Sequence, residues 1–235
     1  MLEITNLNKC KEHAKILLNM EYTIVNSDIF PILSHPIIND TFIPDKNGGV
    51  LNILEDEEAY NKLIKKYTEL IGEAEDYNGL MIFIRNPYKL FFIKITKEFL
   101  SLKDFSTNLI ESWVVDENAN DNINVSKDEL VQYFKEASKE FLMETEDMKV
   151  YSSFDDIVTV YRGLNTFEKS KKAMSWSLSI ETAKWFASRF NNNGNVYKAK
   201  VKKEDILAYC DRRNEKEVIV NYKKVYGIEL LKDKI

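Results

Sequence analysis

The sequence predicts an α+β protein, with a mainly helical N-terminal region followed by a C-terminal region of short strands. Two clear helical patterns lie before residue 150, and five strand-like runs with a single helix lie after it. Strands at this density, with few helices between them, favour a compact antiparallel or mixed β fold. We therefore expect a boundary near residues 144–154 and divide the chain into regions 1–150 and 151–235.

The helical region is predicted from apolar residues at helical spacing and from capping residues. In residues 55–74, apolar side chains recur every three or four positions behind an acidic first turn, which suits the helix dipole. A capping box from Ser126 to Glu129 opens a second helix. Its predicted apolar stripe comprises Leu130, Phe134, Ala137 and Phe141. Both apolar stripes are explained most simply as parts of the hydrophobic core.

The strand region is predicted from short apolar runs separated by polar stretches. The runs are residues 157–161, 173–179, 195–201, 218–222 and 225–231. One helix interrupts them. Ser179 is a good N-cap for this helix, which ends before the breaker Asn-Asn-Asn-Gly.

Composition excludes several classes of protein. The 235 residues are 44% hydrophobic and 30% charged, an ordinary globular profile. No apolar run reaches the roughly 18 residues of a membrane helix, and the first residues lack a signal-peptide pattern, so we expect a cytoplasmic protein with no membrane partner. Two cysteines, Cys10 and Cys210, and two histidines, His13 and His35, predict neither a disulfide framework nor a metal site.

Charge is distributed unevenly along the chain. Residues 162–235 carry 17 Lys and Arg against 9 Asp and Glu, a net +8, whereas the remainder carries −13. The basic C-terminal third favours an anionic ligand such as a dinucleotide, or a nucleic acid, and solvated surface faces explain the same asymmetry about as well.

Two glutamates stand one residue apart at the start of an apolar run. If the strand extends through them, Glu215, Glu217 and Ile219 share one face, because strand side chains alternate. Two carboxylates would then lie side by side. Taken alone, such a pair is more often a pair of solvated charges at a strand end.

Two further motifs precede the glutamates. Arg162 ends one strand, where its guanidinium can clamp a phosphate, and Gly163 after it permits close approach of a ligand to the backbone. On the next strand, Ser175 and Ser177 share a face that can line a pocket, while Trp176 points away. Each motif alone is also compatible with an ordinary surface charge or an amphipathic strand.

Together, Tyr161-Arg162-Gly163, Ser175-Trp176-Ser177 and Glu215-Lys216-Glu217 resemble the arginine-serine-glutamate class of mono-ADP-ribosyltransferases. The resemblance covers about residues 158–231 and implies a split β-sandwich that binds NAD as co-substrate, without a metal. It implies Glu217 and Glu215 as catalytic residues. The implied cofactor-binding residues are Arg162, Gly163, Ser175, Ser177 and Phe186.

Chemistry gives the two glutamates different roles. Breaking the bond from ribose to nicotinamide develops positive charge, which the Glu217 carboxylate would stabilise. Glu215 would help deprotonate the acceptor, and in this class a glutamate at that position often accompanies transfer to arginine. A nucleobase of RNA or DNA is the other acceptor considered. Only twelve residues separate Arg162 from Ser175, fewer than in larger toxins of the class, so target recognition is not carried over.

The expected function is therefore ADP-ribosyl transfer to a macromolecular acceptor, protein more than nucleic acid. The context that fits is a bacterial or phage effector or an intracellular toxin. The acidic N-terminal region would bind the target, a regulator or an antitoxin protein. Two alternatives stay open, an NAD glycohydrolase and a catalytically inactive binding module with the same fold.

Overall fold

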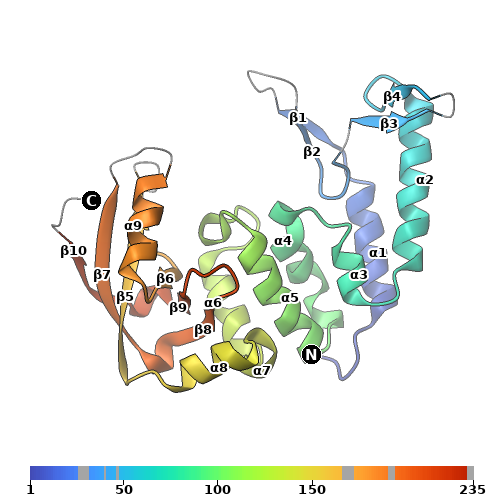
Figure 1. Ribbon diagram of the computed structural model, residues 1–235. Helices are drawn as coiled ribbons and strands as arrows, with labels where there is room; N and C mark the ends of the chain where they lie inside the picture. Colours follow the sequence, from blue (N-terminus) through green and yellow to red (C-terminus); the bar gives the residue numbers. More distant parts are fainter. Residues whose placement is uncertain (26–31, 40, 46–47, 166–171, 190–193, 232–235) are drawn as a thin grey trace. The chain divides into compact units, whose positions relative to one another are not determined.

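The computed structural model describes residues 1–25, 32–39, 41–45, 48–165, 172–189 and 194–231 (Figure 1). By its internal contacts the chain forms two compact units, Met1–Glu117 and Asn118–Ile235. The change from helices to strands along the chain falls between Ser152 and Ile157. Helices α6 to α8 therefore belong to the same compact unit as the C-terminal sheet.

The first unit is mainly helical, with two short β-hairpins. Its helices are α1 (Leu7–Leu18), α2 (Glu57–Glu73), α3 (Tyr77–Met81), α4 (Asn86–Thr96), the 3₁₀ turn η1 (Lys97–Phe99) and α5 (Leu102–Val115). Strands β1 (Thr23–Val25) and β2 (Ile32–Ser34) pair antiparallel, as do β3 (Phe42–Pro44) and β4 (Val50–Asn52). Helix α2 confirms the helix expected within residues 55–74, and the Asp56 side chain caps it by accepting from the Ala59 N–H.

The core of the first unit contains the buried rings of Tyr77, Phe92 and Phe105. Tyr77 and Phe92 stack at 5.8 Å between ring centroids, and the Tyr77 hydroxyl hydrogen-bonds Thr96 Oγ1 at 2.8 Å, so this buried phenol has a polar partner. His35 is also buried. Its Nδ1 accepts from the N–H groups of Ile37 and Ile38, which explains this histidine as a structural residue.

The second unit places three helices before its strands. The helical elements are η2 (Ala119–Asp121), α6 (Lys127–Glu136), α7 (Lys139–Leu142), α8 (Thr145–Ser152), α9 (Ile180–Ser188), η4 (Lys203–Asp205) and η5 (Tyr222–Lys224). The strands are β5 (Ile157–Leu164), β6 (Ser175–Ser177), β7 (Asn195–Lys202), β8 (Ile206–Cys210), β9 (Glu217–Val220) and β10 (Tyr226–Leu230).

These strands form one six-stranded antiparallel sheet in the order β10-β7-β5-β6-β9-β8. Strand β5 pairs with β7 along its whole length, from Ile157 to Leu164. In contrast, one pair of residues, Tyr161 and Ser177, registers β5 with β6. The sheet therefore consists of two three-stranded halves with a narrow connection between them.

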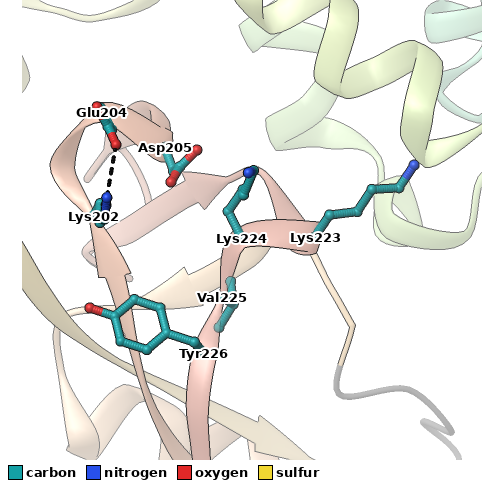
Figure 2. Close-up of a pocket in the computed structure, with 7 residues that line it drawn as sticks. All are labelled: Lys202, Glu204, Asp205, Lys223, Lys224, Val225 and Tyr226. Atoms are coloured by element: carbon teal, nitrogen blue, oxygen red, sulfur yellow. Dashed lines mark hydrogen bonds and ion pairs between the residues drawn. The ribbon is translucent and has the colours of Figure 1, made fainter.

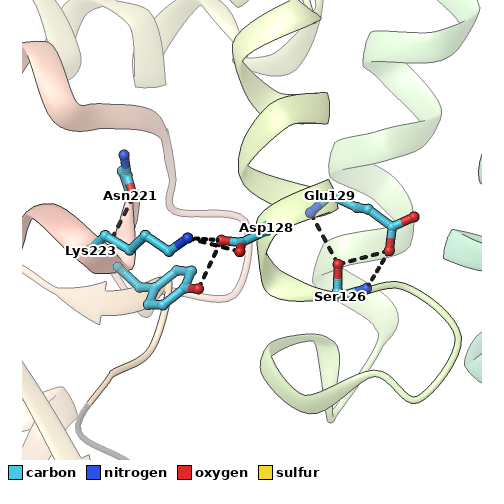
Figure 3. Close-up of polar contacts among 6 residues, drawn as sticks. Ser126, Asp128, Glu129, Asn221 and Lys223 are labelled. Atoms are coloured by element: carbon cyan, nitrogen blue, oxygen red, sulfur yellow. Dashed lines mark hydrogen bonds and ion pairs between the residues drawn. The ribbon is translucent and has the colours of Figure 1, made fainter.

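Helix α6 is tied to the end of β9 by a polar cluster (Figure 3). The Asp128 carboxylate accepts from the Tyr222 hydroxyl at 2.8 Å and pairs with Lys223 Nζ at 2.6 Å. The predicted capping box is present at the start of this helix, where Ser126 and Glu129 cap each other's backbone N–H groups. Residues of α6 thus hold the chain where it leaves β9.

The structure confirms the α+β class and the helical region before an antiparallel sheet, and it corrects two details. Helix α6 ends at Glu136, so Ala137 and Phe141, which were predicted to continue its apolar stripe, lie outside the helix. Ala137 is extended, and Phe141 belongs to the separate short helix α7. Strand β8 was not predicted. All five of its residues are buried, so it lacks the polar and apolar alternation of a half-exposed strand.

Candidate functional site

A row of side chains crosses the sheet through the predicted motifs. Successive cross-strand partners are Glu229, Lys198, Tyr161, Ser177, Glu217 and Cys210. Directly opposite residues on neighbouring strands lie on the same face, with Cβ atoms roughly 5 Å apart. The structure therefore brings Ser177 and Glu217 together as neighbours, at the narrow connection between the two halves of the sheet.

Alternation along β6 and β9 agrees with the sequence prediction. Ser175 pairs with Ile219 and Ser177 with Glu217, so these four residues share a face. Trp176 pairs with Val218 on the other face, where both are buried, and the indole N–H donates to the Ala173 carbonyl at 3.0 Å. Ser177 is 6% exposed, and Glu217 is half-buried.

The Ser177 hydroxyl connects β6 to the backbone of Glu215 and to the start of α9. It donates to the backbone carbonyl of Glu215 at 2.7 Å and accepts from the Ser179 N–H at 2.9 Å. Ser179 is the predicted N-cap of α9, and its own hydroxyl accepts from the Thr182 N–H. One buried hydroxyl thus fixes the backbone before Glu217 and the start of the helix.

The prediction that strand geometry sets Glu215 beside Glu217 is wrong. Strand β9 begins at Glu217, and Lys216 has a left-handed backbone with φ of 47°. Asn214 is left-handed too, with φ of 55°. Glu215 therefore belongs to the turn of residues 211–216 that joins β8 to β9, where side chains do not alternate. Its side chain is 20% exposed and pairs with Arg213, Oε1 lying 3.2 Å from Nε.

The 211–216 turn is held by its first residue and by α8. The Asp211 carboxylate accepts from the Lys216 N–H at 2.8 Å, and the Asp211 carbonyl accepts from the Asn214 N–H at 2.9 Å. The Asp211 N–H in turn donates to the carboxylate of Asp147 in α8. Arg212 pairs with Glu144 at 3.0 Å.

Burial raises the pKa of Asp147, and the nearby Glu144 and Asp211 carboxylates raise it further. The hydrogen bond from the Asp211 N–H and the Arg212 charge oppose this rise. Sequence reasoning missed Asp147 in α8 and Glu144 directly before α8, because both lie about 65 residues before the turn that they support. An acidic first turn is an ordinary helix feature, so no local pattern distinguished them.

Arg162 reaches the backbone of β6. Its Nη1 donates to the Ser175 carbonyl at 2.8 Å, across the narrow connection of the sheet. Arg162 registers with Tyr197, and alternation puts it on the opposite face of β5 from Tyr161. The guanidinium therefore braces β6 against β5, and phosphate binding by Arg162 stays a prediction.

Gly163 is required for the close packing of α9 against β5. A Cβ atom at this position would lie 1.9 Å from the Ala183 carbonyl oxygen and 2.6 Å from the Ala187 nitrogen, so α9 crosses β5 at a separation that only glycine permits. Figure 1 shows α9 lying along β5 and β7. Phe186, also in α9, stacks edge-to-face with Trp185 at 4.9 Å between centroids, and Arg189 lies over its ring.

The start of β6 is held by a residue before α6. Asn120 Oδ1 accepts from the Met174 N–H at 2.7 Å, and Lys127 Nζ donates to the Lys172 carbonyl at 3.2 Å. Asn120 lies in η2, and Lys127 is the first residue of α6. The strand bearing the two serines thus depends on residues outside the three motifs.

A hollow of about 320 Å³ lies away from the motif residues, at the end of β7 (Figure 2). It is lined by Lys202, Glu204, Asp205, Lys223, Lys224, Val225 and Tyr226. Lys202 pairs with Glu204 at 3.3 Å, and Lys223 is the partner of Asp128. These ion pairs already balance part of the charge of the lysines that line the hollow. We therefore place the candidate site at the motif residues and not at the hollow.

Across the described parts of the chain, no cluster of three or more His, Cys, Asp or Glu side chains is arranged to hold a metal ion. Among those same residues, no helix has the length and apolar character to cross a bilayer. Comparisons of the chain with protein-family models, curated proteins and solved structures found no match. The arguments for function therefore come from the residues themselves.

Proposed function

We propose that this protein is an NAD-dependent mono-ADP-ribosyltransferase. The observation that carries the proposal is the convergence of three distant segments: Tyr161, Ser177 and Glu217 are consecutive cross-strand neighbours. The Ser177 hydroxyl also binds the backbone of Glu215. The resemblance to the arginine-serine-glutamate class rests on these same segments, and a sheet of two halves joined at one residue pair is compatible with the split β-sandwich of that class.

In this proposal, Glu217 acts on the ribose of NAD. As the bond to nicotinamide breaks, positive charge develops on the ribose, and a carboxylate fixed on a strand stabilises the transition state more than the ground state. Ser177 positions the glutamate by holding the residues before it. Arg162, Ser175 and Phe186 are the further NAD-binding residues that the resemblance implies, and NAD is the co-substrate.

A protein arginine is the acceptor that we favour. Its guanidinium, with a pKa above about 12, needs a base to become nucleophilic, and Glu215 supplies a carboxylate beside Glu217 in the chain. In this structure the Glu215 carboxylate pairs with the guanidinium of Arg213, the kind of contact that an arginine acceptor would make.

A nucleic-acid acceptor is favoured by one separate observation. Lys198, Lys200 and Lys202 alternate along β7 on the face that bears Tyr161, since Lys198 pairs with Tyr161. Such a row of cations can hold phosphates, with binding that weakens steeply as salt rises. We place this acceptor second, because Lys202 is already paired with Glu204.

The rest of the proposal concerns context. The protein acts in the cytoplasm, as an effector or intracellular toxin, and the Met1–Glu117 unit binds a target or a regulator. Pull-down of that regulator with the full chain, compared with a chain lacking the first unit, tests this assignment.

One experiment tests the proposed activity. The protein is incubated with NAD labelled in the adenylate part, with and without a cell extract, and nicotinamide release and macromolecular label are measured. Transfer to protein predicts label that protease releases and nuclease does not. Label released only by nuclease makes a nucleobase the acceptor, and nicotinamide release without label makes the protein a glycohydrolase. A folded protein that releases no nicotinamide is the inactive binding module.

A further inference from the structure

Arg213 lies beside the proposed acceptor base. It belongs to the 211–216 turn, its side chain is 47% exposed, and its Nε is 3.2 Å from Glu215 Oε1. The neighbouring Arg212 differs in both respects, because its side chain is 22% exposed and it pairs with Glu144 in the segment before α8. Arg162 and Arg189 have their own contacts, with the Ser175 carbonyl and with the rings of α9.

The turn holds this pair in place. Its Asp211 accepts the Lys216 N–H, and Ser177 holds the Glu215 carbonyl, so the backbone on both sides of Arg213 is fixed. Glu217 follows directly as the first residue of β9. A guanidinium, its candidate base and the candidate ribose carboxylate thus lie within five residues of the chain.

We propose that Arg213 is itself an acceptor, so that the protein ADP-ribosylates its own 211–216 turn. This inference rests on the proposed function and adds a modification site to it. The pair with Glu215 places an arginine of the chain itself in contact with the candidate base, through Nε.

The reaction balances with NAD as the one co-reactant. A terminal guanidinium nitrogen of Arg213 forms a bond to C1′ of the ribose, and the C1′ bond to nicotinamide breaks. The electron pair of that bond leaves with nicotinamide, which becomes neutral. The guanidinium loses one proton to the Glu215 carboxylate and from there to solvent, and the bond to the cationic ribose carbon restores the positive charge of the modified guanidinium.

The modification changes the turn. It places a bulky dianionic group on a side chain that had balanced the charge of Glu215. We therefore expect self-modification to slow later turnover, because the bulk and the two negative charges of the added group crowd the turn before Glu217.

The test uses the full chain, NAD labelled in the adenylate part, and Arg213→Lys with Arg212→Lys as the matched control. Label on the chain is mapped by mass spectrometry with fragmentation that preserves the modification, and nicotinamide release is followed in the same samples. We expect label at residue 213 in the wild type and in Arg212→Lys, and its loss in Arg213→Lys.

The other outcomes separate this inference from the proposed function. If nicotinamide is released and the extract is labelled while residue 213 stays unmodified, self-modification at Arg213 is refuted and the transferase proposal stands. Label found only on other residues of the chain, with Arg213 unmodified, also refutes self-modification at Arg213 and leaves the transferase proposal standing. If the folded wild type releases no nicotinamide with or without extract, both proposals fail together.

Discussion

The hydroxyl of Ser177 donates a 2.7 Å hydrogen bond to the backbone carbonyl of Glu215, 38 residues further along the chain. The same oxygen accepts from the N–H of Ser179, where α9 begins. Ser177 also registers directly with Glu217. A single buried side chain therefore links the end of β6, the start of α9 and the turn that carries Glu215.

Ser177→Ala is expected to weaken this link. The Glu215 carbonyl and the Ser179 N–H each lose a partner, which should lower the free energy of unfolding by about 1–3 kcal/mol and reduce NAD turnover. Urea unfolding measures the first effect and nicotinamide release the second. Ser152→Ala is the control, since Ser152 is exposed at the end of α8 and its side chain is not part of this link. Equal, small effects of the two substitutions would contradict the assigned role.

Glu217→Gln is expected to leave the fold intact and to lower both transfer and hydrolysis by about 100-fold or more. The amide has the same shape but lacks the charge that stabilises the developing cation. The matched control is Glu229→Gln, which removes the same charge from the exposed far end of the same cross-strand row. Near-normal turnover in a folded Glu217→Gln protein refutes the mechanism.

Glu215→Gln is expected to separate the two reactions. If Glu215 serves the acceptor, transfer falls while NAD hydrolysis continues, because Glu217 still stabilises the ribose cation. Nicotinamide release and label transfer, measured in the same samples, give the ratio of the two. Equal loss of both activities contradicts the division of roles between the glutamates.

The sequence predicted the elements of the second unit better than their connections. Period-two alternation correctly grouped Ser175 with Ser177, and it failed at Glu215 because the chain turns through left-handed residues at Asn214 and Lys216. Asn214 is a residue type that adopts this conformation, but Lys216 is not, so the left-handed backbone directly before Glu217 had no compositional signal. Strand β8, Ile206–Cys210, was not predicted because its residues are all buried and show no alternation of polar and apolar side chains.

The supports of the candidate site were harder to predict than the motif residues. All three supports precede the motifs: Asn120 and Asp147 accept backbone N–H groups at the start of β6 and in the 211–216 turn, and Glu144 pairs with the Arg212 side chain. A single sequence does not encode which distant carbonyl or N–H a side chain will meet. The packing role of Gly163 was likewise hidden, because the helix that requires it begins 17 residues later.

Gly163→Ala is expected to disrupt the second unit. The added Cβ would overlap the Ala183 carbonyl oxygen at 1.9 Å, which forces α9 away from β5 and should cost about 3 kcal/mol or more. Gly72→Ala in α2 is the control, because no atom lies within 4 Å of its added Cβ and alanine favours helices by up to about 1 kcal/mol. Thermal unfolding of both variants checks the contrast, and an unchanged melting temperature for Gly163→Ala would contradict this packing.

The last prediction concerns Asp147, which is 7% exposed and accepts the Asp211 N–H. Asp147→Asn keeps an acceptor oxygen, whereas Asp147→Leu removes it. We therefore expect the Asp211 and Lys216 amides to exchange faster in the Leu variant and to stay protected in the Asn variant.

Burial raises the pKa of Asp147 in the folded state, so the native protein binds the proton more tightly than the unfolded chain does. The wild type therefore loses stability as pH rises from the unfolded carboxyl pKa through the folded pKa, a loss that Asp147→Asn does not show. Hydrogen exchange of the 211–216 turn and urea unfolding across this pH range measure the two effects. Unchanged exchange in the folded Leu variant would remove Asp147 from the support of the turn.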